Sequence, residues 1–186
     1  FRQNFSQVTN PPIDSLRENK VMSLKTRFGN LGNILDFDNL TEETIYVLDS
    51  PILTNSQFKK FRKFFSKKTK VIDCTFDISS SLKDRIEEIR VEAETSVREG
   101  STCIILSDKN ISNQKATIPS ILVVGAVHSY LVKQGLRGYC SLNVECSDAL
   151  DTHSFAVLIG VGATTINPYL AIDSIYQRFE KKLFGK

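Results

Sequence analysis

The sequence predicts an α/β domain built on a parallel sheet, with about five consecutive strand–helix units that form a partial or degenerate (β/α) barrel-like arrangement. Three observations support this fold class. Strand-like and helix-like segments alternate from about residue 41 onward. Residues 102–106 (TCIIL) are almost wholly apolar, as is typical of a parallel strand buried on both faces. Residues 116–171 repeat the order helix, strand, helix, strand.

The first strand is expected at residues 45–48, followed by a helix that begins near Ser56. In this helix Phe58, Phe61 and Phe65 recur at helical spacing, while basic side chains occupy the other face. Basic residues interleaved with aromatics also occur in proteins that bind polyanions. A buried phenylalanine stripe under solvated lysines is the simpler interpretation of residues 59–70.

The remaining elements follow the helical period of 3.6 residues or the strand period of two residues, and proline and glycine mark their ends. The helix between Pro119 and Gly135 has almost no polar face, so we expect it to be covered on most sides. Further strands are expected at residues 71–76, 102–106, 139–146 and 164–166, and further helices at about 81–99, 119–133, 151–159 and 168–183.

Composition is ordinary for a single globular domain, since 41% of the 186 residues are hydrophobic and 24% are charged. We divide the chain into an amino-terminal connector, residues 1–40, and an α/β core, residues 41–186. The formal charge of +3 gives no case for nucleic acid or a membrane surface as partner. The longest apolar runs are far shorter than the roughly 20 residues of a membrane-spanning helix.

Four cysteines occur without a CxxC pair. Cys140 and Cys146 share a strand face but stand roughly 20 Å apart at about 3.3 Å per residue, too far to bind each other or one metal. We therefore expect free, buried thiols and a reducing compartment, the cytoplasm or an organelle stroma.

Motifs for catalysis or cofactor binding are weak. Gly160-Val161-Gly162 follows a helix, which favours a helix stop over a phosphate-binding turn. His128 and His153 lack further metal ligands in sequence reach, so we interpret both as hydrogen-bonded packing residues. No catalytic residue, cofactor site or metal site is expected in this chain.

The best-placed polar group in the sequence is Ser107, Asp108 and Lys109. These residues directly follow the apolar strand at 102–106. Ligands of parallel α/β proteins bind at the carboxyl ends of strands, so this loop is a candidate ligand site. A capped loop without a ligand is the alternative.

Two segments of the sequence resemble the central domain of the large subunit of glutamate synthase: residues 1–24 (FRQNFSQVTNPPIDSLRENKVMSL) and residues 118–171, from IPSILVVGAVHSYLVKQG to GATTINPYLA. The resemblance implies a non-catalytic part of an oxidoreductase that makes L-glutamate from L-glutamine and 2-oxoglutarate. It also implies that this domain links a glutamine amidotransferase domain to an FMN and iron–sulfur synthase domain and helps wall the ammonia path. Those two domains of the same parent chain would be its partners, and the cofactors would be theirs.

Within the resemblance, Thr9, Asn10 and Asp14 flank two prolines that fix an extended backbone. Their hydroxyl, amide and carboxyl groups suit an ammonia path or an interdomain contact. A plain connector, whose polar groups only cap neighbouring backbone, is the alternative. Two rival hypotheses remain: a free-standing small α/β enzyme or binding module for a phosphorylated ligand at the 107–115 loop, and a basic binding module acting through residues 59–70. The electron donor of the parent, whether NADPH, NADH or ferredoxin, is left open.

Overall fold

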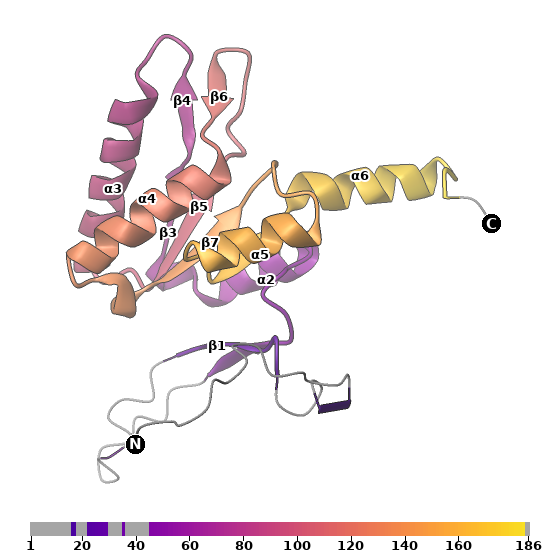
Figure 1. Cartoon of the computed structure of the whole chain (residues 1–186), viewed down its shortest axis with the longest axis horizontal. Helices are drawn as coiled ribbons and strands as arrows, with labels where there is room; N and C mark the ends of the chain where they lie inside the picture. Colours follow the sequence, from indigo (N-terminus) through magenta and orange to yellow (C-terminus); the bar gives the residue numbers. More distant parts are fainter. Residues whose placement is uncertain (1–15, 18–21, 30–34, 36–44, 185–186) are drawn as a thin grey trace, which may run out of the picture.

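A computed structural model of the chain describes residues 16–17, 22–29, 35 and 45–184 (Figure 1). Its strands are β1 (Thr26–Phe28), β2 (Tyr46–Leu48), β3 (Thr69–Asp73), β4 (Thr75–Asp77), β5 (Cys103–Ser107), β6 (Lys115–Thr117), β7 (Ser141–Glu145) and β8 (Thr165–Asn167). Its helices are α2 (Asn55–Phe64), α3 (Leu82–Arg98), α4 (Ser120–Lys133), α5 (Thr152–Gly160) and α6 (Tyr169–Glu180).

The centre of the fold is a parallel sheet with the strand order β3-β5-β7-β8. Ile52 extends this sheet beyond β8, because it forms a parallel bridge with Ile166 before the chain enters α2. Each of the four strands is followed by a helix, which gives four strand–helix units in succession. The expected first strand, residues 45–48, is not part of this sheet, because β2 pairs antiparallel with β1. Ile52 takes its place before α2 as a single bridge residue. The predicted α/β fold with a partial, barrel-like parallel sheet is confirmed.

Helices cover both faces of the sheet (Figure 1). On one face, Ile104 and Leu106 of β5 pack with buried residues of α3, α4 and α5. On the other face, Cys103 and Ile105 of the same strand join Phe61 of α2 and the β1–β2 pair in a second cluster. Alternate side chains of β5 thus enter two separate cores, which explains why its sequence is continuously apolar.

The apolar patterns of the sequence predict that seven residues of these strands and helices lie in the interior. Six of them are buried and Phe155 is partly buried against the same cluster. The six are Ile104, Leu106, Val123, Val127, Leu142 and Val144.

The expected strand at residues 71–76 is wrong in one respect, because it consists of two strands in different sheets. The Asp73 carboxylate accepts hydrogen bonds from the Thr75 backbone N–H at 3.0 Å and from its hydroxyl at 2.8 Å, which turns the chain after β3. β4 then pairs antiparallel with β6, so the expected loop at 107–116 also contains a strand.

Helix α4 is less covered than its apolar sequence predicts. Val123, Val124 and Val127 are buried, but Ile121 and Leu122 remain 47% and 43% exposed. The expectation of burial on most sides therefore holds for the face toward the sheet and fails for the outer face.

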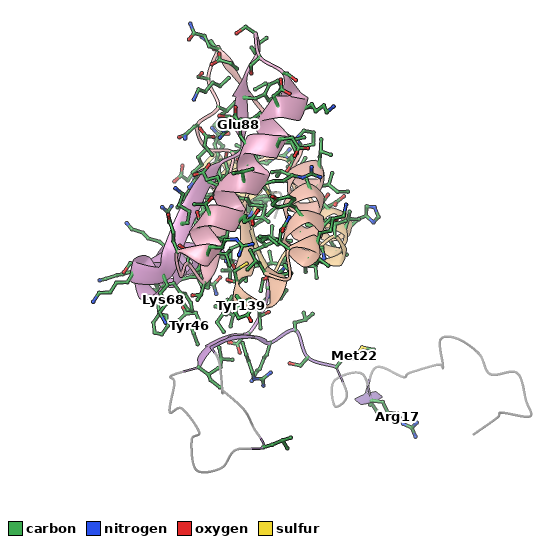
Figure 2. All side chains as sticks on the ribbon, turned by 90° about the vertical axis from the view of Figure 1, so that its left-hand side faces the viewer. Arg17, Met22, Tyr46, Lys68, Glu88 and Tyr139 are labelled. Carbon is green, nitrogen blue, oxygen red and sulfur yellow. The ribbon has the colours of Figure 1, made fainter. Side chains whose placement is uncertain are left out.

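Figure 2 shows Glu88 of α3 toward the upper end of the α/β core, and Lys68 and Tyr139 at its lower end, beside Tyr46 of β2. Across the residues that the structure describes, there is no helix with the length and apolar character needed to cross a membrane.

Arg137, in the short 3-10 helix η3 (Arg137–Tyr139), joins α4 and the segment after α5 to the start of β7. Its guanidinium donates to His128 Nδ1 at 3.1 Å, to the Cys140 carbonyl at 2.6 Å and to the Gly162 carbonyl at 2.9 Å. His128 is therefore the hydrogen-bonded packing residue that the sequence predicts, whereas His153 is exposed.

This contact predicts a pH dependence of stability. Burial and the neighbouring Arg137 charge lower the pKa of His128, so folding favours the neutral imidazole. The unfolded chain takes up a proton near the ordinary pKa of about 6.5 while the folded chain does not. Stability due to His128 is thus present above pH about 6.5 and is lost as the pH falls from there toward the lower folded pKa.

Urea denaturation at pH 7.5, 6.5 and 5.5 measures this effect. His128→Gln keeps an acceptor but cannot titrate, so we expect it to lose less stability than wild type over this interval. His153→Gln, at an exposed position, is the control and should follow wild type. Equal slopes for wild type and His128→Gln would rule out His128 as the titrating group.

Candidate functional site

Four polar residues form a row across the carboxyl ends of the parallel strands. Asp73, Ser107, Glu145 and Asn167 are the last residues of β3, β5, β7 and β8, and each pairs in register with the next. This edge is where parallel α/β proteins bind ligands. We therefore treat the row and the loops that follow it as the candidate site.

Glu145 is the centre of the row, because three side chains converge on its carboxylate. The Ser107 hydroxyl donates to Oε2 at 2.7 Å, Lys109 Nζ lies 2.7 Å from Oε1, and Arg62 of α2 lies 3.9 Å from Oε1. Glu145 is only 2% exposed, whereas the Lys109 side chain is about half-exposed. The buried charge is thus compensated by cations that reach in from the surface.

Asp108 binds the loop that follows β7. Its Oδ2 accepts from the Ser147 backbone N–H at 2.8 Å and from the Ser147 hydroxyl at 2.6 Å. Oδ1 is buried and, within the described part of the chain, makes no hydrogen bond of standard geometry. Burial and the nearby Asp108 carboxylate raise the pKa of the Tyr169 hydroxyl, which keeps that group protonated.

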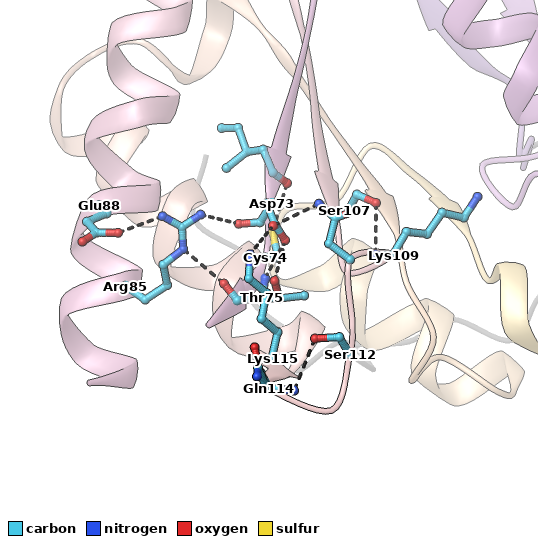
Figure 3. Close-up of polar contacts among 12 residues, drawn as sticks. Asp73, Cys74, Thr75, Arg85, Glu88, Ser107, Lys109, Ser112, Gln114 and Lys115 are labelled. Carbon is cyan, nitrogen blue, oxygen red and sulfur yellow. Dashed lines mark hydrogen bonds and ion pairs between the residues drawn. The ribbon is translucent and has the colours of Figure 1, made fainter. Parts of the chain in front are cut away.

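The β3 end of the row is a turn fixed by side chains (Figure 3). Arg85 of α3 donates to the Asp73 carbonyl at 2.7 Å and to the Thr75 carbonyl at 3.2 Å. Burial acts to raise the pKa of the Asp73 carboxyl, but hydrogen bonds from Asn110 and Thr75 hold it below its usual value. Asp73 is therefore an ionised turn residue rather than a proton donor.

On the sheet face toward α2, strands β7 and β8 also carry polar side chains that are buried. Asn143 is fully buried and its Oδ1 accepts from the Thr165 hydroxyl at 2.7 Å. Asn167 donates to the Leu53 carbonyl and to Asn55 Oδ1, both at 2.9 Å. Asn143 thus binds neighbouring strands of the sheet, whereas Asn167 connects the sheet to the start of α2.

The arrangement is a polar network that binds mainly to itself. Ser107 faces a carboxylate without an intervening histidine, so the described residues offer no activated nucleophile of the usual kind. Two buried carboxylates, Asp108 and Glu145, disfavour an anionic ligand such as a phosphate. A surface hollow of about 390 Å³ lies at the opposite edge, lined by residues that include Gly100, Thr102 and Tyr139.

The structure brings Ser107, Asp108 and Lys109 together at the predicted edge, and Lys109 Nζ also lies 4.9 Å from the centre of the Tyr169 ring. Whether this group binds a ligand stays a prediction. Thr9, Asn10 and Asp14 lie outside the described residues.

Sequence reasoning missed three residues of the row: Asp73, Glu145 and Asn167. Each directly ends an apolar or alternating strand, which is a signal that the sequence contains. Only the strand register shows that they are neighbours.

The four cysteines are free and buried, as the sequence predicts. Burial is the largest cause that raises their pKa, to about 12 for Cys146, and it acts in the same direction on Cys74, Cys103 and Cys140. Protonated thiols are poor metal ligands. Within the described ranges no three His, Cys, Asp or Glu residues are grouped so that they could hold a metal ion.

Comparison with known proteins places these features in context. The sequence model of the family described as "Glutamate synthase central domain" matches residues 1–185. The large chain of the NADPH glutamate synthase of Azospirillum brasilense is 53% identical over 188 residues, which cover 100% of this chain and 12% of that protein. The chloroplastic ferredoxin-dependent glutamate synthase of Spinacia oleracea is 38% identical over 183 residues, covering 95% of this chain and 11% of that protein. The chain thus spans about an eighth or less of the length of these relatives.

Proposed function

The chain belongs to the family of glutamate synthase central domains, and from this membership we propose that it is a non-catalytic linking domain of a glutamate synthase large chain. It connects the glutamine amidotransferase domain to the FMN and iron–sulfur synthase domain and helps wall the path of ammonia. The parent makes L-glutamate from L-glutamine and 2-oxoglutarate. The observation that carries this proposal is the family match over residues 1–185, in relatives of which the chain covers 11–12%.

The buried polar network supports a linking role. It ties β5, β7, β8 and α2 together through Ser107, Glu145, Asn167 and their partners. Fully paired buried groups rigidify a domain, because moving any one of them leaves another without a partner. A rigid domain can hold two catalytic domains at a constant separation.

FMN and an iron–sulfur cluster do not fit the described residues. A cluster needs several thiolates around one point, and here Cys74, Cys103, Cys140 and Cys146 are separate, buried and protonated. A flavin phosphate needs backbone N–H groups between a strand and a helix, whereas Gly160–Gly162 ends a helix. We therefore assign both cofactors to other parts of the large chain.

A free-standing enzyme or binding module for a phosphorylated ligand at the 107–115 loop has less support. Lys109 is already bound to Glu145 at 2.7 Å, and Asp108 beside it adds a second buried negative charge. A phosphate would have to displace Glu145 from Lys109 against both carboxylates. A basic module at residues 59–70 is also less supported, since Phe58 and Phe61 are buried and the lysines form the solvated face.

Thr9→Val in the full-length large chain tests the proposed ammonia path. Valine keeps the shape of threonine but removes the hydroxyl that would bind a small polar molecule. We expect glutamine hydrolysis to exceed 2-oxoglutarate amination, with the glutaminase rate preserved. The measurement is the ratio of glutamine consumed to 2-oxoglutarate consumed in the same assay.

Thr152→Val, at the exposed start of α5, is the matched control and should keep the two rates equal. If Thr9→Val also consumed the two substrates one to one at the wild-type rate, Thr9 would be a connector residue and its assignment to the ammonia path would be dropped.

A further inference from the structure

Helix α6 extends away from the rest of the domain (Figure 1). None of its 12 residues is buried. It is held near its start by Asn55, which donates to Asp173 Oδ1 at 2.7 Å, and by Lys109 over the Tyr169 ring. An isolated helix of this length is marginal in water, so α6 needs a surface to pack against.

Apolar residues form one stripe along α6 and just beyond its last turn. Ile172, Ile175, Tyr176, Phe179 and Leu183 are spaced at i, i+3, i+4, i+7 and i+11, which places them on one side of a helix. Ile175, Tyr176, Phe179 and Leu183 are 58%, 60%, 71% and 61% exposed. Contiguous apolar surface of this kind typically marks an interaction site.

The end of α6 is folded so that the stripe continues past the last helical turn. The Leu183 N–H donates to the Arg178 carbonyl at 3.0 Å and the Lys182 N–H donates to the Phe179 carbonyl at 2.9 Å. With Lys182 at a φ of 53°, these bonds form a Schellman motif, which turns the chain back toward the helix. Leu183 is thereby placed beside the last turn.

Positive charges flank the carboxyl-terminal half of the stripe. Arg178, Lys181 and Lys182 lie there against a single acidic residue, Glu180. A partner surface complementary to this helix is an apolar groove with an acidic rim.

We propose that the α6 stripe docks into such a groove on another part of the same glutamate synthase large chain. The relatives supply the polypeptide for it, since this sequence covers only 12% of the Azospirillum protein and 11% of the spinach protein. The inference goes beyond the linking role, because it names the surface through which the domain is held. It depends on family membership but not on the ammonia path.

Hydrogen–deuterium exchange on the full-length large chain tests the proposal. We expect the amides of residues 172–183 to exchange roughly a hundredfold or more slower than in an unstructured peptide. Ile175→Asp combined with Phe179→Asp should abolish this protection. Gln177→Asp, on the opposite face of the helix, should keep it. Fast exchange in wild type, or protection that survives the double substitution, would overturn the proposal.

Zero-length carbodiimide cross-linking identifies the occupant. In an equimolar mixture of ¹⁴N- and ¹⁵N-labelled large chains, Lys181 and Lys182 should link to Asp or Glu residues outside residues 1–186, without mixed-isotope products. Mixed-isotope products would assign the stripe to a second copy and overturn the proposal. Neither readout uses enzyme activity, so both are independent of the Thr9→Val result.

Discussion

Gly162→Ala is expected to lower the free energy of unfolding by about 4 kcal/mol, as backbone strain and overpacking add. A Cβ at this position would lie 2.4 Å from Cγ and Nδ1 of His128 and 2.8 Å from its Cβ. The backbone φ of +124° is also one that residues with a side chain rarely adopt. Urea denaturation of the 186-residue chain at pH 7.5 measures the loss.

Gly100→Ala separates the two causes. Gly100 has a φ of +96°, but nothing lies within 4 Å of its added Cβ, so this variant reports backbone strain alone. It should cost about 1–2 kcal/mol. Adding His128→Ala to Gly162→Ala should recover part of the larger loss. If both glycine substitutions lowered the free energy of unfolding equally, the His128 ring would move aside at no cost and overpacking would contribute nothing.

The importance of Gly162 illustrates what a sequence predicts and what it does not. The Gly160–Gly162 segment was expected to end a helix, and it does end α5. Gly162 approaches His128, 34 positions earlier, because α4 packs against α5. No local sequence pattern predicts that packing. The same holds for Arg137, which donates to His128 on α4 and to Gly162 after α5.

An element was predictable where a single sequence pattern determines it. Strand β5 follows from its almost continuous run of apolar residues, which is typical of a parallel strand buried on both faces. The break after β3 was not predictable in this way, because a single side chain, Asp73, ends the strand by binding Thr75. Strand β6 was missed for a related reason: Lys115–Thr117 is short, and only its pairing with β4 makes it a strand.

The candidate site was predictable in position but not in composition. Ser107, Asp108 and Lys109 follow an apolar strand, and parallel topology then places them at the carboxyl edge. In the expected strand at 139–146, Asn143 and Glu145 alternate with apolar residues, which predicts a polar side facing water. That side is buried beneath α2 instead. Sequence alone could not show this burial, because the cations that compensate Glu145 come from α2 and from the loop after β5.

Lys109→Met is expected to destabilise the chain by about 3 kcal/mol, and by more than Glu145→Gln, although Lys109 is the more exposed partner. Methionine removes the cation 2.7 Å from Oε1 and leaves a buried carboxylate, with only Arg62 at 3.9 Å and the Ser107 hydroxyl still bound to it. Glu145→Gln removes the buried charge itself, while Lys109 can turn to solvent. That change should cost about 1–2 kcal/mol for weaker hydrogen bonds.

Combining both substitutions tests whether loss of the Lys109–Glu145 ion pair causes the loss of stability in Lys109→Met. Without the carboxylate, the missing cation no longer matters, so Lys109→Met with Glu145→Gln should be more stable than Lys109→Met alone. Lys133→Met, at an exposed position on α4, controls for the loss of a surface lysine and should change stability by less than about 0.5 kcal/mol. The free energies of unfolding of wild type, the two single variants and the double variant, measured by urea denaturation, give the coupling energy. If the two substitutions were simply additive, Glu145 would be compensated by Arg62 and Ser107 alone, and Lys109 would be free to bind a ligand.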